Sequence, residues 1–434
     1  MESTYRDANL LRNTPPKFII INGGRELSGE IFVSGSKNAT FPILAASFAL
    51  SLNSTIENVP NVSDVDVMLK ILENFGVEYE RKNNTLFFDA TRCYNSEINK
   101  RLAGMIRGSV LLISAVLGRF GRVKMPPAGG CAIGNRPIDQ HIKTLETLGI
   151  NVKIENDGSI YADCEYIKGG TIKFDKVTVT GTENALILAS LSDEIIEIQN
   201  AALEPEINEL CKFLVTCGAK IEGIGSRTIS IKGRANPSVK KVKWKIIPDR
   251  IEAGTWAVIA SATEGEITIK NAVIEHLDSV LRKLEETGVT VNQEAKTIKI
   301  KKEGKRKLKP VDVYSEPFPG FPTDLQSPIA AYLSQIDGTS KIIDSVFPSR
   351  FSYAEQLAKF GAEIEFFKGG IIINGRSLRG CDVTATDLRA AASLIVAGLT
   401  AEGKTVIRNP NYLFRGYDSI CEKLLSLGAD ISVK

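Results

Sequence analysis

A ten-residue phrase occurs six times along the chain, and this repetition limits the folds that the sequence can adopt. The copies are ILENFGVEYE, TLETLGINVK, FLVTCGAKIE, KLEETGVTVN, QLAKFGAEIE and KLLSLGADIS. Their glycines lie 67 to 73 residues apart, at Gly76, Gly149, Gly218, Gly288, Gly361 and Gly428. A spacing this regular indicates one structural unit repeated six times.

The residues before each glycine have the period of an amphipathic helix. Positions eleven, eight, seven, four and one before the glycine follow the i, i+3, i+4, i+7 spacing of one helix face. In the first copy they are Val65, Met68, Leu69, Leu72 and Phe75. We expect each glycine to cap its helix, and the β-rich residues after it to begin a strand.

Polar or reactive residues at these positions need a separate interpretation. Cys211, Cys217 and Cys421 lie on the helix face, which predicts that they are packing residues. His141 is expected to be a buried, hydrogen-bonded histidine, because such histidines are more common than ligands. Arg350 is expected to face a polar cavity, because arginine is almost never buried without a partner.

A second, wholly apolar helix is expected upstream of each amphipathic one, introduced by a turn rich in charge. These turns are SGSKNAT, GMIRGSV, VTGTENA, PDRIEAG, FPTDLQS and ATDLRAA. Helix N-termini carry unpaired N–H groups and the positive dipole end, so they are natural anion sites. With flanking strands such as GEIFVSG and KTVIRNP, each unit reads strand, helix, strand, helix, strand, which predicts an α/β protein.

The six units group most simply three by three. A chain of 434 residues suits two or three domains, and the lysine-rich stretch SVKKVKWK between the third and fourth units is the expected crossing point. We predict one domain made of residues 1–36 and 246–434 and a second made of residues 37–245. The charged helix starts are expected to converge on the cleft between the two lobes, where we expect the active site.

Composition excludes several classes of protein. The chain has 54 basic and 51 acidic residues, so it offers no reason to expect a nucleic-acid or membrane partner. Its first eighteen residues do not resemble a signal peptide or a membrane span. The seven cysteines form no CxxC pair and the two histidines form no metal-binding pattern. We therefore expect a cytosolic protein with free thiols, without a metal or cofactor, and the sequence leaves its oligomeric state open.

Two cations begin apolar segments. Lys37, followed by Asn38, lies in a Gly-Ser-Lys turn that suits either a phosphate or plain solvation, and the GxxxxGK[ST] spacing of a P-loop is absent. Arg107 comes early in a helix that is otherwise apolar, which makes it a candidate for binding an anionic ligand.

Two acidic residues begin helices of the second half. Asp324 is flanked by prolines and a glycine that restrict the backbone, so it could be a general base or a residue that compensates the helix dipole. Asp387 and Arg389, in ATDLRAA, could serve a site or simply pair with each other.

Cys131 differs from the other cysteines. It lies in MPPAGGCAIGNRP, among prolines and glycines that fit neither a helix interior nor a regular strand, and the glycines indicate a loop that moves. A thiol with an unperturbed pKa of about 8.5 is mostly protonated at neutral pH, so it can donate a proton. It could also act as a nucleophile if Arg136 or a substrate shifts its pKa.

Linked motifs along nearly the whole chain, from about Lys17 to Lys434, resemble those of the enolpyruvyl transferase family, in its UDP-N-acetylglucosamine 1-carboxyvinyltransferase branch. They are SGSKNATFPILAAS, NVPNVSDVD, PPAGGCAIGNRPIDQHI, EPEI, IPDRIEAGT, PGFPTDLQ, ATDLRAAASLIVAG and RGYDSI. The related shikimate-pathway enzymes typically have a Ser-Lys-Ser start and lack the GGCAIG loop. The resemblance implies an inside-out α/β barrel of two lobes, each built from three βαβαββ units.

The resemblance also implies a reaction. The enolpyruvyl group of phosphoenolpyruvate would move to the 3′-hydroxyl of UDP-N-acetylglucosamine by addition and elimination, with release of phosphate. This is the first committed step of peptidoglycan precursor synthesis. Cys131 would protonate the methylene carbon, Asp324 would accept the hydroxyl proton, and the epoxide fosfomycin would alkylate Cys131.

The remaining roles come from the same resemblance. Lys37, Arg136, Arg389 and Arg415 match the anion-binding set, and Lys37 and Arg415 also count as catalytic. Residues 136–140 would line the uridine site together with Lys176, Thr178 and Val179. Asn38, Val346 and Phe347 would approach the amino sugar. The residues assigned to substrate binding are Asn38, Arg107, Arg136, Pro137, Ile138, Asp139, Gln140, Lys176, Thr178, Val179, Val346, Phe347, Arg350, Asp387 and Arg389.

Some segments depart from the usual family pattern. FPSRFSYAEQL stands where FENRFMHV is usual, NYLFRGYD replaces HIDRGYE, Leu203 replaces a frequent arginine, and Asn135 a common alanine. These changes concern the acceptor side and leave two alternatives open. One is a related transferase of specialised metabolism that uses another nucleotide, such as UMP, and the other is an inactive sugar-nucleotide-binding regulator.

Overall fold

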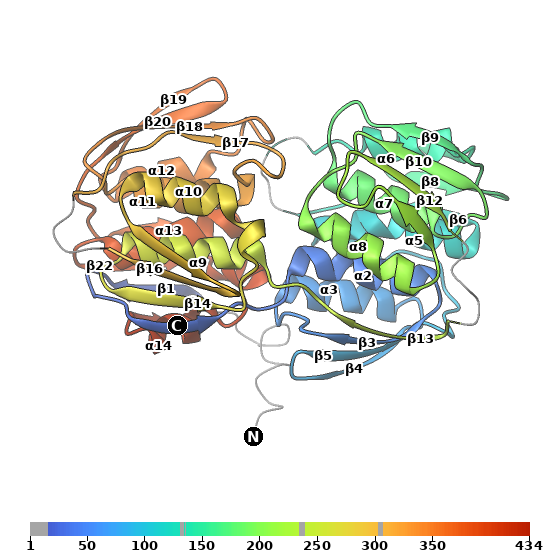
Figure 1. The fold of residues 1–434 in the computed structure, drawn as a ribbon, viewed down its shortest axis with the longest axis horizontal. Helices are drawn as coiled ribbons and strands as arrows, with labels where there is room; N and C mark the ends of the chain where they lie inside the picture. The colour runs from blue at the N-terminus through green and yellow to red at the C-terminus, as the bar shows by residue number, and fades with distance from the viewer. Residues whose placement is uncertain (1–15, 131–133, 135, 234–238, 303–306) are drawn as a thin grey trace. The chain divides into compact units, whose positions relative to one another are not determined.

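The computed structural model describes residues 16–130, 134, 136–233, 239–302 and 307–434. These residues form two compact units (Figure 1). Unit 1 contains the chain up to Ser34 and Pro248–Lys434, and unit 2 contains most of the chain between Gly35 and Ile247. The chain therefore leaves unit 1 after Ser34 and returns to it after Ile247, shortly beyond the lysine-rich stretch.

Each unit contains three β-sheets. In unit 1 the strands pair in the orders β21(Asp382–Thr384)-β22(Lys404–Arg408)-β1(Phe18–Asn22)-β23(Asp430–Val433), β15(Thr290–Glu294)-β16(Thr297–Lys301)-β14(Glu266–Lys270)-β2(Gly29–Phe32) and β17(Val313–Ser315)-β18(Gly338–Asp344)-β20(Gly370–Gly375)-β19(Glu363–Phe367). In unit 2 the orders are β13(Lys241–Lys245)-β3(Asn53–Glu57)-β5(Thr85–Asp89)-β4(Glu78–Lys82), β11(Lys220–Glu222)-β12(Thr228–Lys232)-β10(Ile195–Gln199)-β9(Gly170–Lys173) and β6(Arg122–Met125)-β8(Ile160–Asp163)-β7(Asn151–Ile154).

The sheets repeat one pattern, in which a parallel strand joins an antiparallel set of three. The parallel pairs are β2 with β14, β9 with β10, β13 with β3, β17 with β18 and β21 with β22. Within the described residues, the sheet of β6, β8 and β7 has no such parallel strand, and the short helix α4 (Lys100–Ala103) precedes its first helix instead. The expected order of elements is therefore confirmed in five repeats and is incomplete in the second.

Six helices lie inside the two units. They are α2 (Lys37–Ala49), α5 (Leu112–Phe120) and α7 (Val179–Ala189) in unit 2, and α9 (Arg250–Ala262), α11 (Gln326–Leu333) and α13 (Leu388–Thr400) in unit 1. Within each unit these three helices contact one another, and most of their residues are buried, as expected for helices that are apolar all round (Figure 1). The helices are internal and the sheets cover them, which confirms the predicted inside-out α/β architecture.

The inner helices begin at the predicted charged turns. The second and fifth do so through a 3₁₀ turn, η2 (Arg107–Leu111) and η4 (Thr323–Leu325). Two further 3₁₀ turns, η3 (Ile274–His276) and η5 (Pro410–Arg415), precede amphipathic helices.

The amphipathic helices also agree with the prediction. They are α3 (Ser63–Glu73), α6 (Asp139–Thr147), α8 (Pro205–Thr216), α10 (Asp278–Thr287), α12 (Ser352–Lys359) and α14 (Ile420–Ser426). The predicted face of the first copy is buried throughout. All six repeat glycines have positive φ, from 78° to 105°, a region that favours glycine.

Strand β1 closes the last repeat. It lies between β22 and β23 and pairs antiparallel with both, although about 380 residues separate it from β22 in the sequence. Ile19 and Ile21 of β1 are fully buried. The first strand of the chain therefore completes the sixth copy of the repeat.

Candidate active site

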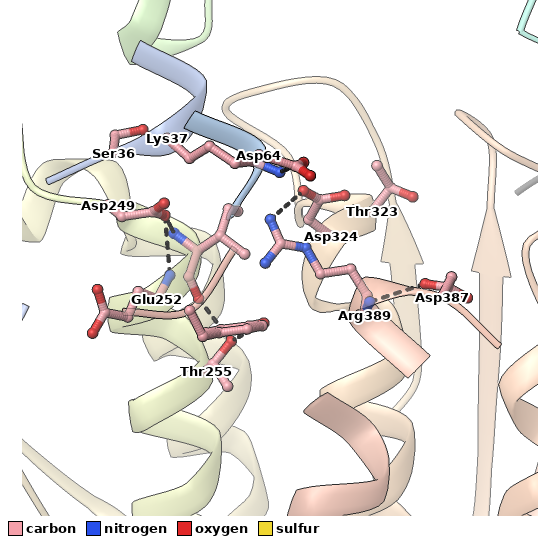
Figure 2. A network of polar contacts seen from close by, with 12 residues as sticks. Ser36, Lys37, Asp64, Asp249, Glu252, Thr255, Thr323, Asp324, Asp387 and Arg389 are labelled. Atoms are coloured by element: carbon pink, nitrogen blue, oxygen red, sulfur yellow. Dashed lines mark hydrogen bonds and ion pairs between the residues drawn. The ribbon is translucent and has the colours of Figure 1, made fainter. Parts of the chain in front are cut away.

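Asp324 lies in η4, at the start of α11, and two arginines bind its carboxylate. Nη1 of Arg350 is 2.8 Å from Oδ1. Nη2 of Arg389 is 2.7 Å from Oδ2, and Figure 2 shows this second contact. Both arginine side chains are almost completely buried, whereas 27% of the Asp324 side chain is exposed. The sequence predicts that Arg350 faces a polar cavity; the structure shows it buried and paired with the carboxylate of Asp324.

The charges around Asp324 decide its protonation state. Burial by itself would raise the pKa of Asp324, but Arg389 and Arg350 together hold this pKa well below its usual range. Asp324 is therefore ionised at neutral pH. A carboxylate in this state can accept a proton, and it is a weak base as long as both arginines remain bound to it.

The structure decides whether the side chains of Asp387 and Arg389 pair with each other. Oδ1 of Asp387 accepts hydrogen bonds from the backbone N–H groups of Arg389 and Ala390, at 2.9 and 3.2 Å, and thereby caps α13. The Arg389 side chain extends to Asp324 instead (Figure 2). Its guanidinium lies 5.2 Å from the ring centroid of Tyr417. Asp387 thus fixes the start of the helix that carries Arg389.

Asp344 is a residue of this network that the sequence reasoning missed. It ends β18 and is 1% exposed, and its oxygens accept hydrogen bonds from Thr323, Gln326 and the backbone of Val346 and Phe347. The available signal was a lone carboxylate that ends the apolar strand KIID, just before the two residues assigned to the acceptor site.

Lys37 is the first residue of α2 and is not a solvated surface lysine. It is 8% exposed, and its Nζ is 3.0 Å from Oδ2 of Asp64, another residue that the sequence reasoning missed (Figure 2). Ser36 caps the helix by accepting a hydrogen bond from the backbone N–H of Ala39. Asn38 follows and is partly exposed.

Arg415 ends η5 and is partly exposed. It belongs to unit 1, as do Asp324, Arg350 and Arg389. Lys37, Arg107 and Arg136 belong to unit 2.

The structure brings together most of the residues assigned to the uridine site. Helix α6 begins at Asp139 and α7 at Val179, and these helices contact each other. Nζ of Lys176 is 3.3 Å from Asp139, and Thr178 caps α7. The hydrogen bond from Gln140 and the charge of Lys176 lower the pKa of Asp139. These helix starts therefore hold one cation and one anion in contact with each other.

A cavity of about 160 Å³ lies beside these helix starts in unit 2. Nη2 of Arg107 donates a hydrogen bond to the backbone oxygen of Arg136 at 2.7 Å. Burial lowers the pKa of Arg107. The cavity is lined by Arg107, Val110, Ile113, Met125, Pro126, Pro127, Ala128, Arg136, Pro137, Ile138, Gly158 and Ile160. It therefore combines an apolar wall with two guanidinium groups.

Cys131 lies outside the described residues, as does Asn135. The residues that lead to Cys131 are tightly packed. A Cβ at Gly129 would lie 1.7 Å from the backbone oxygen of Gly104, and a Cβ at Gly130 would lie 2.9 Å from the Cβ of Arg107. Glycine is therefore required at both positions, and the start of the loop is held against the segment that carries Arg107.

His141 is buried, as predicted. Its Nε2 is 3.0 Å from Oγ1 of Thr180, whereas Nδ1 has no hydrogen-bond partner among the described residues. Burial, followed by the nearby charge of Arg107, lowers the pKa of His141 to about 4. The ring is therefore neutral at physiological pH and links α6 to α7.

The helix-face cysteines are packing residues, as predicted. Cys211, Cys217 and Cys421 are buried, and burial raises the pKa of each thiol to about 12. The described residues contain no group of three or more His, Cys, Asp or Glu side chains that could hold a metal ion. None of the described helices combines the length and hydropathy needed to cross a bilayer.

The sequence is similar to known transferases over almost its whole length. Residues 21–424 match the family described as EPSP synthase (3-phosphoshikimate 1-carboxyvinyltransferase). The UDP-N-acetylglucosamine 1-carboxyvinyltransferase of Halothermothrix orenii is 41% identical over 412 residues, which cover 95% of this chain and 98% of the relative. The protein of the same name from Myxococcus xanthus is 42% identical over 419 residues, with the same coverage.

Two solved structures have a similar fold. The enolpyruvyl transferase NikO from Streptomyces tendae matches with a TM-score of 0.86 and 26% identity, covering 97% of this chain and 99% of that one. EPSP synthase from Acinetobacter baumannii matches with a TM-score of 0.73 and 18% identity, covering 96% and 100%, which shows the fold alone.

Proposed function

The chain belongs to the EPSP synthase (3-phosphoshikimate 1-carboxyvinyltransferase) family, and from this membership we propose that it transfers the enolpyruvyl group of phosphoenolpyruvate to the 3′-hydroxyl of UDP-N-acetylglucosamine. The observation that carries the proposal is the 41–42% identity, over 95% of the chain, to relatives named for that reaction. The proposed role is the first committed step of peptidoglycan precursor synthesis, in the cytoplasm.

The proposed reaction proceeds by addition and elimination. The acceptor oxygen adds to C2 of phosphoenolpyruvate while C3 gains a proton, which gives a tetrahedral intermediate. Loss of phosphate from C2 and of a proton from C3 then regenerates the double bond. The products are the enolpyruvyl ether and inorganic phosphate, so no redox partner is required.

Cationic side chains would bind the donor. Their positive charges are opposite to those of the phosphate and the carboxylate of the donor, and charge-assisted hydrogen bonds from guanidinium groups suit both anions. These side chains are Lys37, Arg136, Arg389 and Arg415, with Arg107 and Arg350. Buried cations need little reorganisation when the charge on the leaving phosphate develops.

Asp324 would accept the proton of the acceptor hydroxyl. Arg350 and Arg389 lower its pKa in the present arrangement. A donor anion that competes for the same two guanidinium groups would weaken their hold on Asp324 and so strengthen it as a base. Cys131 would supply the proton to C3, as the general acid of the addition step.

The acceptor would be recognised by unit 2 and by the turn after β18. The uridine diphosphate part would contact Asp139, Gln140, Lys176, Thr178 and Val179. Asn38, Val346 and Phe347 would approach the amino sugar, and Asp387 would act through the start of α13.

The proposal is tested by supplying the purified protein with phosphoenolpyruvate and either UDP-N-acetylglucosamine or UMP, and measuring released phosphate together with the mass of the nucleotide product. With UDP-N-acetylglucosamine we expect release of phosphate and a nucleotide product whose mass has increased by one enolpyruvyl group. Turnover with UMP alone would favour the specialised-metabolism alternative. Absence of turnover with both would favour the regulatory one.

Variants separate the two proton-transfer roles from folding. Asp324→Ala and Cys131→Ser should each lose about 10²–10⁴-fold in kcat, because each removes a proton-transferring group. Cys211→Ser serves as the control, since it replaces a buried packing thiol of α8 to which no role in the reaction is assigned. It should mainly lower the unfolding midpoint, and equal turnover in Cys131→Ser and Cys211→Ser would refute the role of Cys131.

A further inference from the structure

The buried carboxylate of Asp344 is satisfied entirely by hydrogen bonds. Its Oδ1 accepts from the backbone N–H groups of Val346 and Phe347, at 2.8 and 2.7 Å. Its Oδ2 accepts from Oγ1 of Thr323 at 2.6 Å and from Nε2 of Gln326 at 3.1 Å. Among the described residues no lysine or arginine forms an ion pair with it, so these four donors compensate its burial.

The chemistry of the partners sets the direction of each hydrogen bond. An ionised carboxylate can only accept, so the single hydroxyl proton of Thr323 is donated to Asp344. Oγ1 of Thr323 also lies 3.2 Å from Nη1 of Arg350, and a guanidinium can only donate. Thr323 is therefore an acceptor for Arg350 because Asp344 takes its proton.

Arg350 is held by this arrangement on two sides. Its Nη1 also donates to Oδ1 of Asp324 at 2.8 Å. Its guanidinium lies 5.9 Å from the ring centroid of Phe347, whose backbone N–H is bound by Asp344. Asp344 thus acts on Arg350 through the hydroxyl of Thr323 and through the turn that carries Phe347.

We propose that Asp344 is a positioning residue for enolpyruvyl transfer, which fixes Arg350 against Asp324 by way of Thr323 and the Val346–Phe347 turn. This inference rests on the proposed function, in which Asp324 is the base and Arg350 binds the donor. The hydrogen bonds that Asp344 accepts keep Arg350 and Asp324 in a single relative geometry before any substrate binds. A reacting group displaced by about 1 Å can lose about 10²-fold in rate, so such positioning affects turnover directly.

Two substitutions of nearly unchanged shape interrupt the chain of hydrogen bonds. Asp344→Asn replaces one acceptor oxygen by an NH₂ group, which cannot accept a hydrogen bond. The one oxygen that remains cannot accept from Thr323 and from the backbone N–H groups at the same time. Thr323→Val removes the hydroxyl and keeps the branched shape. Thr323→Ser keeps the hydroxyl and is the rescue variant. Thr339→Val is the matched control, because Thr339 is an exposed residue of β18 whose hydroxyl donates to Oδ1 of Asn374.

We expect Asp344→Asn and Thr323→Val to lower kcat/KM for phosphoenolpyruvate about 10- to 100-fold. Thr323→Ser and Thr339→Val should stay within about threefold of the wild type. The double variant Asp344→Asn/Thr323→Val should be no slower than the slower single variant, because the two residues act in series.

The pH profile provides a readout that a purely structural role would not change. The acid limb of kcat/KM reports the essential base of the free enzyme. If Arg350 is held less firmly, it lowers the pKa of Asp324 less, and the limb moves to higher pH. The charged groups that act on Asp324 are Arg389 and Arg350; Tyr417 and Asp249 act on Arg389, and Tyr353 of α12 faces Asp344.

Each outcome supports or overturns the inference. Wild-type kcat/KM and an unshifted acid limb in Thr323→Val would overturn it, even if Asp344→Asn fails to fold. If the wild type shows no turnover, the proposed function fails. The crystal structure of Thr323→Val then tests whether Thr323 positions Arg350. A guanidinium of Arg350 displaced from Asp324 in that structure supports the inference, and an unmoved one overturns it.

Discussion

At the scale of single residues, the environment of a side chain decides its chemistry more than its type does. Asp324, Asp344 and Asp387 all carry carboxylates within unit 1. Asp324 binds two arginines, Asp344 binds four neutral donors, and Asp387 caps a helix. Of the three, Asp324 is the most exposed, and it is the one to which we assign proton transfer.

His141 should make the stability of the protein depend on pH. The pKa of its ring is about 4 in the folded chain and about 6.5 in an unfolded one. Between these values the unfolded chain binds a proton that the folded chain excludes. The free energy of unfolding should therefore fall by roughly 2–3 kcal/mol as the pH is lowered from 7 to 4 because of this residue.

The measurement is the difference in urea unfolding free energy between the wild type and His141→Gln at pH 7.5 and at pH 4.5. We expect the unfolding free energy of the wild type to fall relative to that of His141→Gln at the lower pH, because glutamine does not titrate. His276→Gln is the control, since His276 lies partly exposed on η3. A difference that is the same at both pH values would contradict a neutral buried ring.

At the scale of elements, each repeat depends on a helix that ends at a glycine with positive φ. Gly361, after α12, has φ of 98°, and a Cβ built on it would meet only the backbone oxygen of Ser377, at 4.0 Å. Replacement by alanine therefore tests backbone strain without a steric clash. We expect Gly361→Ala to lower the free energy of unfolding by about 1–2 kcal/mol, measured by urea denaturation.

Gly104→Ala is the comparison for this prediction. Gly104 follows α4 with an ordinary helical φ of −69°, where alanine adopts the same conformation without strain. Its substitution should cost less than about 1 kcal/mol. Equal losses in the two variants would mean that the left-handed cap contributes nothing specific to the repeat.

At the scale of the whole molecule, the first and last strands of the described residues lie side by side in one sheet. β1 is an interior strand, with β22 on one side and β23 on the other, and the backbone of Lys17 bonds to that of Lys434. Removal of β1 would leave two strands without their partner and would expose the core that Ile19 and Ile21 fill.

A chain that starts at Gly24 should therefore fail to fold unit 1, whereas a chain that starts at Pro16 should keep it folded. Soluble yield and the urea unfolding transition of the two truncated chains measure this. An unchanged transition in the chain that lacks β1 would show that the last repeat is stable with two antiparallel strands.

Periodicity along the sequence determined the number of repeats, the alternation of helices and strands, and which helices are apolar all round. These properties are local, because a helix face or a glycine cap is defined by residues within about a dozen positions of one another. The motifs shared with known transferases also supplied Asp324, Lys37 and the arginines as candidates.

Only the tertiary structure decided which of these elements and side chains meet. β1 pairs with strands from the other end of the chain, β2 joins the sheet of the fourth repeat, and Arg350 and Arg389 bind Asp324 rather than solvent or Asp387. Asp64 and Asp344 had no visible role until their partners were placed. Such contacts join residues that are far apart in the sequence, and they depend on the packing of helices and sheets, which no local period records.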